Sequence, residues 1–180
     1  MDINLIVNLC SKAWGLSILA NIHAGVPGRQ AALLQATGAG RSAFGASVNH
    51  LIRIGLLRRR DGHGHPLRPE FELTDHGRYV ATFAEMVWAQ VRAEEQPLLR
   101  KAWSLPVIAV LAQEDSYGAV RRTLSPITDR ALSQSLRGLE RAKWVERRVD
   151  IAARPPKPSY LTIGTGVVLA EISLRFNEAT

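Results

Sequence analysis

Apolar residues recur with the spacing of a helix face in the second half of the chain. The first set lies at i, i+4, i+7 and i+8 and comprises Trp103, Val107, Val110 and Leu111. The stretch "YGAVRRTL" predicts a short second helix, and the turn "SPIT" places Thr128 as the N-cap of a third. We expect this third helix over 129–142, because Leu132, Leu136 and Leu139 would then all face the core.

A β-hairpin is expected after the third helix, because the spacing changes there from helical to alternating. "WVERRVD" and "SYLTI" predict its two strands. The stretch "AARPPKP" between them cannot be a central strand, since proline has no N–H to donate to a ladder. A last helix is expected over 166–177. Three helices followed by a basic hairpin is the order of a winged helix-turn-helix.

The first half of the chain predicts the same order of elements. Helices are expected over 5–23, 30–36 and 41–54, and "TGAG" forms the turn before the third. "GLLRRR" and "EFELT" predict the strands of a hairpin whose tip is "DGHGHPLRP". A further helix over 75–93 leads through "EEQP" into the second half.

The two halves also repeat individual residues in the same order. Lys-Ala-Trp occurs at 12–14 and at 101–103, a shift of 89, and Leu51 of the third predicted helix meets Leu139 at a shift of 88. Leu-Thr occurs at 73–74 and at 161–162, with one extra residue expected after the second pair. This order indicates an internal duplication with a period too long for a solenoid. The sequence therefore predicts a mainly α fold with small β-hairpin wings, built as two tandem winged helix-turn-helix domains at 1–95 and 96–180.

The charge balance points to a polyanionic partner. The 180 residues carry a net charge of +7, with a pI of about 10.3, which favours nucleic acid over an anionic membrane. Cys10 is the single cysteine, so there is no internal disulfide, and we expect it to be buried. Asp2 stands where a signal peptide would be positive, and no apolar run reaches the roughly 20 residues of a membrane span. We therefore expect a cytoplasmic protein that does not engage a membrane.

One segment resembles a known family. "DRALSQSLRGLERAKWVERR" followed by "PSYLT" resembles the third helix and wing of HxlR-type bacterial transcription regulators, which belong to the MarR- and PadR-like group. "KAWSLPVIAVL" resembles their opening helix, so the resemblance covers most of 101–162. It implies a bacterial, nucleoid-associated regulator of transcription. Relatives usually place two copies of one domain on a palindromic operator, so a single chain would here bind a pseudo-palindromic site.

The second copy carries the richer set of candidate DNA contacts. Residues 121–157 hold ten Lys and Arg against four Asp and Glu, a net charge of +6, and clustered cations bind phosphates. Arginine and glutamine can read base edges in the major groove. The candidates are Arg130, Ser133, Gln134, Arg137 and Arg141 on the open face of the third helix, with Arg154 and Lys157 in the hairpin.

The first copy has a different third helix. Gly45 and Ala46 stand where the second copy has Ser133 and Gln134. Small residues would let the backbone approach DNA closely, or they mark a copy that has lost base reading. The candidates are Arg41, Ser42, Asn49 and Arg53 on the helix, with Arg59 and Arg68 in the hairpin. Arg58, Arg59 and Arg60 must alternate faces, so not all three can contact DNA.

Other chemistries find little support. His63 and His65 in the hairpin tip lack further ligands for a metal site, and no catalytic motif occurs, so we expect no enzyme, metal or cofactor. Trp88 and Trp103 could line an effector cavity, although core packing is the commoner role of such aromatics. A homodimer and a small-molecule effector stay open. The alternative function is a winged-helix scaffold that binds another protein, such as part of the transcription machinery.

Overall fold

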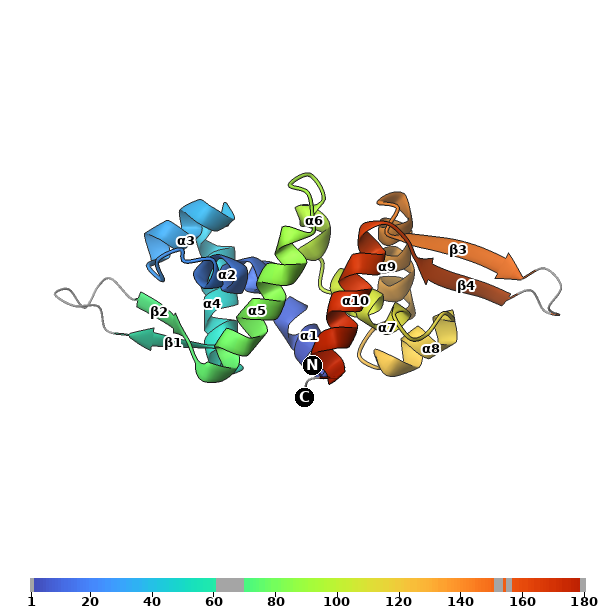
Figure 1. Ribbon diagram of the computed structural model, residues 1–180, viewed down its shortest axis with the longest axis horizontal. Helices are drawn as coiled ribbons and strands as arrows, with labels where there is room; N and C mark the ends of the chain where they lie inside the picture. Colours follow the sequence, from blue (N-terminus) through green and yellow to red (C-terminus); the bar gives the residue numbers. More distant parts are fainter. Residues whose placement is uncertain (1, 61–69, 151–153, 155–156, 179–180) are drawn as a thin grey trace. The chain divides into compact units, whose positions relative to one another are not determined.

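Helices dominate the computed structural model, which describes residues 2–60, 70–150, 154 and 157–178 (Figure 1). Two small antiparallel sheets of two strands each complete the fold. The chain divides into two compact units. The N-terminal unit is Asn8–Ala89, and the C-terminal unit is Gln90–Thr180 together with Met1–Val7.

The C-terminal unit has the predicted order of elements. Its helices are α6 (Gln96–Leu99), α7 (Ser104–Leu111), α8 (Tyr117–Thr123), α9 (Asp129–Arg141) and α10 (Thr165–Glu178). Strands β3 (Val145–Asp150) and β4 (Lys157–Thr162) form the hairpin between α9 and α10. A bridge from Ser116 to Ser159 joins the segment before α8 to the other edge of β4. This arrangement is that of a winged helix, and it confirms the predicted helices and hairpin.

The core of the C-terminal unit forms around α9. Leu132, Leu136 and Leu139 are at most 1% exposed, as their spacing predicts, and Trp144 after the helix is equally buried. Thr128 is the predicted N-cap, because its hydroxyl accepts a hydrogen bond of 3.2 Å from the amide of Ala131. Pro158 lies inside β4, where it is tolerated because the sheet has only edge strands.

The N-terminal unit has a matching order. Its helices are α2 (Gly15–His23), α3 (Gln30–Thr37), α4 (Arg41–Arg53) and α5 (Asp75–Ala89), with β1 (Leu57–Arg60) and β2 (Glu70–Leu73) between α4 and α5. A bridge from Arg29 to Glu70 precedes α3. The hairpin packs on α4 through Phe71, whose ring meets Phe44 edge to face at 6.4 Å.

Three boundaries differ from the sequence prediction. The helix expected over 5–23 is two helices, α1 (Ile3–Cys10) and α2. The turn between them brings the chain so close that a Cβ at Gly15 would lie 2.6 Å from the carbonyl oxygen of Leu9. The helix expected to reach residue 93 ends at Ala89, and the stretch read as a link contains α6. There the amides of Glu95 and Gln96 bond to the carbonyl of Arg92 and form a turn.

The hairpin registers correct one of the sequence matches. Leu57 and Val145 begin the first strand of each hairpin and match at the shift of 88. Leu57 pairs with Leu73, whereas Val145 pairs with Thr162. By position in the hairpin, Leu73 therefore corresponds to Thr162 and not to Leu161. After the hairpins, a Cβ at Gly77 would lie 1.9 Å from the carbonyl oxygen of Leu56, and a Cβ at Gly166 would lie 2.0 Å from that of Trp144, in each case the residue before the first strand. The C-terminal unit therefore has one residue more than the N-terminal unit between these points, and it lies within the hairpin and not after it.

Candidate nucleic-acid interface

Helix α9 presents an open polar face opposite its buried leucines. Arg130, Gln134, Arg137 and Arg141 are exposed on it, and Ser133 is half-buried. None of the three arginines forms an ion pair with another described residue. Their guanidinium groups are therefore available to an external anion or to the acceptor edge of a base.

Helix α8 fixes the start of α9. The hydroxyl of Tyr117 donates to the carbonyl of Asp129 at 3.1 Å and lies 3.3 Å from Oγ of Ser133. Nε of Arg121 donates to the carboxylate of Asp129 at 3.3 Å, and its Nη1 donates to the carbonyl of Ser125 at 3.2 Å. Sequence reasoning missed the part of Tyr117, since only the packing of the two helices brings its hydroxyl to Ser133.

The hairpin of the C-terminal unit separates its cations by face. Arg147 lies opposite Tyr160, and it shares a face with Val145, because side chains alternate along a strand. Tyr160 and Val145 are buried, so this face is the one turned to the helices. Arg148 lies on the other face and donates to Glu146 at 2.8 Å. Arg147, which sequence reasoning did not select, is thus the cation of β3 on this face, and it forms no ion pair with another described residue.

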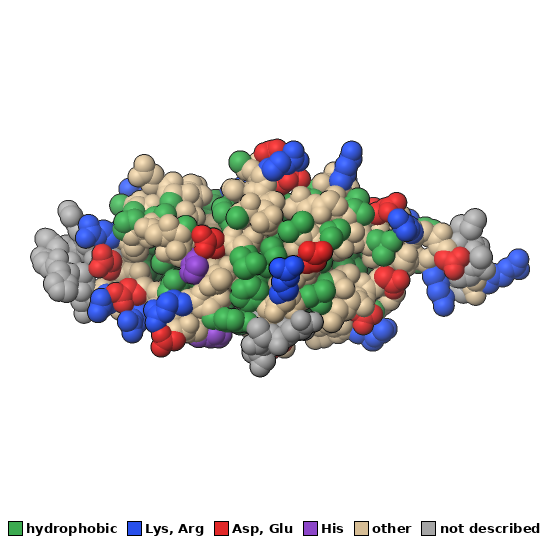
Figure 2. Space-filling model, viewed as in Figure 1, with side chains coloured by type: hydrophobic (Ala, Val, Ile, Leu, Met, Phe, Trp, Pro, Cys, Tyr) green, Lys and Arg blue, Asp and Glu red, His purple; other side chains and the backbone are tan. Residues whose placement is uncertain are grey.

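The two selected hairpin residues of this unit lie elsewhere. Lys157 pairs with Asp150 and so belongs to the face of Arg148. Arg154 is exposed in the connection between the strands. Figure 2 shows Lys and Arg side chains in blue on this hairpin. The structure therefore brings Arg147, but not Lys157, to the side of the hairpin that carries the buried residues.

Helix α4 presents a smaller face. Arg41, Ser42, Asn49 and Arg53 are exposed as predicted. Between them a Cβ on Gly45 would have no neighbour within 4 Å, so packing within the described residues does not require this glycine. A glycine inside a helix costs about 0.5–1 kcal/mol relative to alanine. The open space is compatible with close approach of the helix backbone to a partner.

A buried histidine holds one of these cations. Nη2 of Arg53 lies 2.9 Å from Nδ1 of His50, to which it donates. Nε2 of His50 lies 2.7 Å from the carbonyl oxygen of Asn8 and 3.0 Å from Oγ of Ser11. Sequence reasoning did not single out His50, because Asn8 and Ser11 lie about 40 residues earlier in the chain.

Carboxylates pair with two of the three arginines in the described part of the N-terminal hairpin, and with Arg29 before α3. Glu72 accepts from Arg60 at 2.6 Å and from Arg58 at 3.2 Å. Glu70 accepts from Arg29 at 3.1 Å. Arg59 lies opposite Phe71, on the face that packs on α4, and makes no ion pair with a described residue. Arg68, His63 and His65 lie outside the described residues.

Other candidate sites are limited. Among the described residues, no three or more His, Cys, Asp or Glu side chains are grouped so as to hold a metal ion. Burial raises the pKa of Cys10 to about 12, so its thiol is protonated and unreactive at neutral pH. Within the same residues, no single helix is long and apolar enough to cross a membrane.

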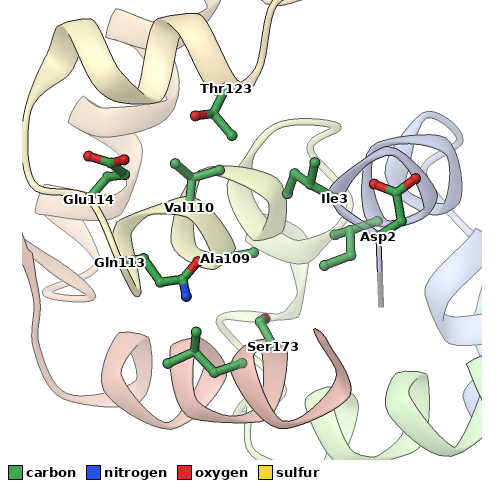
Figure 3. Close-up of a pocket in the computed structure, with 10 residues that line it drawn as sticks. Asp2, Ile3, Ala109, Val110, Gln113, Glu114, Thr123 and Ser173 are labelled. Carbon is green, nitrogen blue, oxygen red and sulfur yellow. The ribbon is translucent and has the colours of Figure 1, made fainter. Parts of the chain in front are cut away.

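A pocket of about 240 Å³ lies within the C-terminal unit (Figure 3). Apolar side chains such as Ile3, Ala109 and Val110 line it together with the carboxylates of Asp2 and Glu114, which stand on opposite sides in the figure. Neither Trp88 nor Trp103 lines this pocket, so it is not the effector cavity considered from the sequence.

Comparison with known proteins bears on the C-terminal unit. Residues 98–178 match the family model described as HxlR-like helix-turn-helix. The match runs from the end of α6 to the end of α10 and includes the whole of α9 and its hairpin. No curated protein matches the chain. The matched residues are thus similar to a family of DNA-binding transcription regulators, and this similarity is the identification that the comparisons support.

Proposed function

We propose that the protein is a sequence-specific transcription regulator that binds double-stranded DNA through two linked winged-helix units on a pseudo-palindromic site. The observation that carries the proposal is the open face of α9, where three unpaired arginines and Gln134 stand opposite a fully buried leucine face. A helix of this kind fits the major groove, and arginine and glutamine suit guanine and adenine edges. The basic pI supports the same partner.

The proposal of two related units rests on backbone geometry that recurs in both. Helices α4 and α9 each have 13 residues. Each is followed, two residues after its end, by a residue with positive φ: Gly55 at 75° and Lys143 at 56°. Trp14 and Trp103, before α2 and α7, have φ of −108° and −106°. The proposed domains, 1–95 and 96–180, differ from the compact units only in residues 1–7 and 90–95.

We further propose that the two units have unequal roles. In the C-terminal unit, Gln134 and Arg137 read bases, with help from Arg130 and Ser133, and Arg147 contacts phosphate. In the N-terminal unit, Arg41, Arg53 and Arg59 contact phosphates, while Glu72 pairs with Arg58 and Arg60, and Glu70 pairs with Arg29. The sequence charges, +2 for 1–95 and +5 for 96–180, support this division.

A second candidate function is a scaffold that binds another protein. The neutralised hairpin and the small residues of α4 favour it for the N-terminal unit, because such a surface has little charge to offer DNA. The two functions predict different responses to salt. Binding to phosphates weakens steeply as salt rises, whereas a mainly apolar protein interface does not.

Affinity for a duplex of random sequence, measured across a series of salt concentrations, tests the proposal. We expect binding that weakens linearly in a log–log plot, with a slope that reports several phosphate contacts. Absence of binding at low salt would refute the DNA-binding function. The protein-binding scaffold would then be the remaining candidate function. A regulator of this kind would act on the nucleoid of a bacterial cell.

A further inference from the structure

Lys143 adopts a backbone conformation that lysine disfavours. Its φ of 56° is the only positive φ of a non-glycine residue in the part of the chain that the structure describes. In this left-handed region a Cβ crowds the following carbonyl oxygen, so glycine is the usual occupant, and asparagine or aspartate the usual substitute. A lysine that keeps this conformation must be held there by the fold.

The fold requires the conformation but not the lysine. The amide of Lys143 bonds to the carbonyl of Glu140 at 3.0 Å, and the amide of Trp144 bonds to the carbonyl of Leu139 at 3.0 Å. These bonds end α9 and direct the chain into β3, as in a common helix C-terminal motif. They use backbone atoms only. The side chain of residue 143 therefore has no part in the turn itself.

The N-terminal unit makes the same turn with glycine. The amide of Gly55 bonds to the carbonyl of Ile52 at 3.0 Å, and the amide of Leu56 bonds to that of Leu51 at 2.9 Å. Gly55 has a φ of 75° and no cost from a side chain. The chain thus contains the less strained solution at the corresponding place, which serves as an internal reference for Lys143.

The position of Lys143 suits contact with a polyanion. The residue is exposed and forms no ion pair with another described residue. It follows Arg141 at the end of α9 and precedes β3, which carries Arg147. A cation near a helix C-terminus also interacts with the macrodipole, but this effect is weak at an exposed position and is screened by salt. Binding of the ammonium group to an external phosphate would explain the presence of lysine at this position better than the dipole does.

We propose that Lys143 binds a DNA phosphate at the edge of the groove that α9 occupies, and that this contact exists only in the C-terminal unit. The inference rests on the proposed DNA-binding function and adds to it a residue that neither the family match nor the pattern of α9 assigns. Gly55 leaves the N-terminal unit without an equivalent contact. The ammonium acts as a point charge on the phosphate, so the contact does not depend on DNA sequence.

Three variants of the full chain test the proposal. Lys143→Gly removes the charge and relieves the backbone, Lys143→Arg keeps the charge, and Lys12→Gln removes an exposed lysine from outside the proposed contacts. Each is measured for urea unfolding and for binding to a random-sequence duplex over a salt series. We expect Lys143→Gly to unfold at an equal or higher urea concentration than the parent protein.

The same variant should bind DNA about threefold or more weakly, with a salt slope reduced by about one. Lys143→Arg and Lys12→Gln should both bind as the parent does. The proposal is wrong if Lys143→Gly retains the parent affinity and slope, if it loses stability, or if Lys12→Gln causes the same loss of binding. Failure of the parent protein itself to bind any duplex would instead refute the proposed function, and the inference with it.

Discussion

Arg53 is tied to the core of the N-terminal unit by His50, whose Nδ1 accepts from its guanidinium at 2.9 Å. The other ring nitrogen faces the carbonyl of Asn8, 2.7 Å away, so the imidazole links α4 to the end of α1. Because a neutral imidazole has one donor and one acceptor, these two contacts fix the proton on Nε2. The geometry connects a proposed phosphate contact to a buried polar group.

Replacing His50 should therefore affect folding more than DNA binding. His50→Ala removes a side chain that is only 7% exposed and is expected to lower the free energy of unfolding by about 1–3 kcal/mol. Arg53→Ala should leave this energy within about 0.5 kcal/mol of the parent value. Urea unfolding followed by circular dichroism measures both. A loss of less than about 0.5 kcal/mol in His50→Ala would show that His50 has no structural part.

Base reading by α9 predicts altered sequence preference. Gln134→Ala and Arg137→Ala should each relax one position of the bound sequence, at a cost of about 1–3 kcal/mol. Arg59→Ala should weaken binding to all sequences alike. Selection from randomised duplexes with each variant makes the comparison. The assignment of roles is wrong if both α9 variants keep the parent's preferred sequence while a change at Asn49 alters it.

Gly45 offers a test of close approach. Gly45→Ala adds a Cβ where nothing lies within 4 Å, so we expect the free energy of unfolding to rise by about 0.5–1 kcal/mol. DNA affinity should fall if the helix backbone lies against the duplex. Gly138→Ala is the matched control on α9, where the new Cβ would make ordinary contacts of 3.7 Å. A variant that is more stable and binds DNA unchanged would contradict close approach at Gly45.

The C-terminal unit should be less stable in acid, in part through Glu95. A hydrogen bond from Arg92 lowers the pKa of this carboxyl, and Nε1 of Trp144 donates to it at 3.1 Å. A carboxyl with a lowered pKa contributes stability above its unfolded pKa and loses that contribution as pH falls through the folded value. Glu95→Gln can still accept from Trp144 but has no charge to lose. Unfolding by urea at neutral and acidic pH should show a smaller change for this variant than for the parent protein.

The sequence predicted those parts of the fold that depend on local spacing. Leu132, Leu136 and Leu139 define the buried face of α9, and the alternation after Trp144 defines β3. It did not predict the break before Gly15, because that turn depends on the approach of the chain to the carbonyl of Leu9. The pattern of apolar residues simply continues through the turn.

The candidate site was predictable to a similar extent. The exposed residues of both third helices follow from the helical period, and the alternation of strand faces excluded contact of DNA with all of Arg58, Arg59 and Arg60. The pairing of Arg58 and Arg60 with Glu72, and the contact of Tyr117 with Ser133, depend on strand register and on helix packing. Arg147 was missed although alternation places it on the face of Val145, and its pairing with the buried Tyr160 identifies that face as the one turned to the helices.

Selection of the unmodified protein on fully randomised duplexes tests the central claim most directly. We predict an enriched sequence with two half-sites, in which one half, bound by the C-terminal unit, is more strongly specified than the other. Recovery of no preferred sequence, together with binding that does not strengthen as salt is lowered, would contradict the claim and favour the protein-binding scaffold.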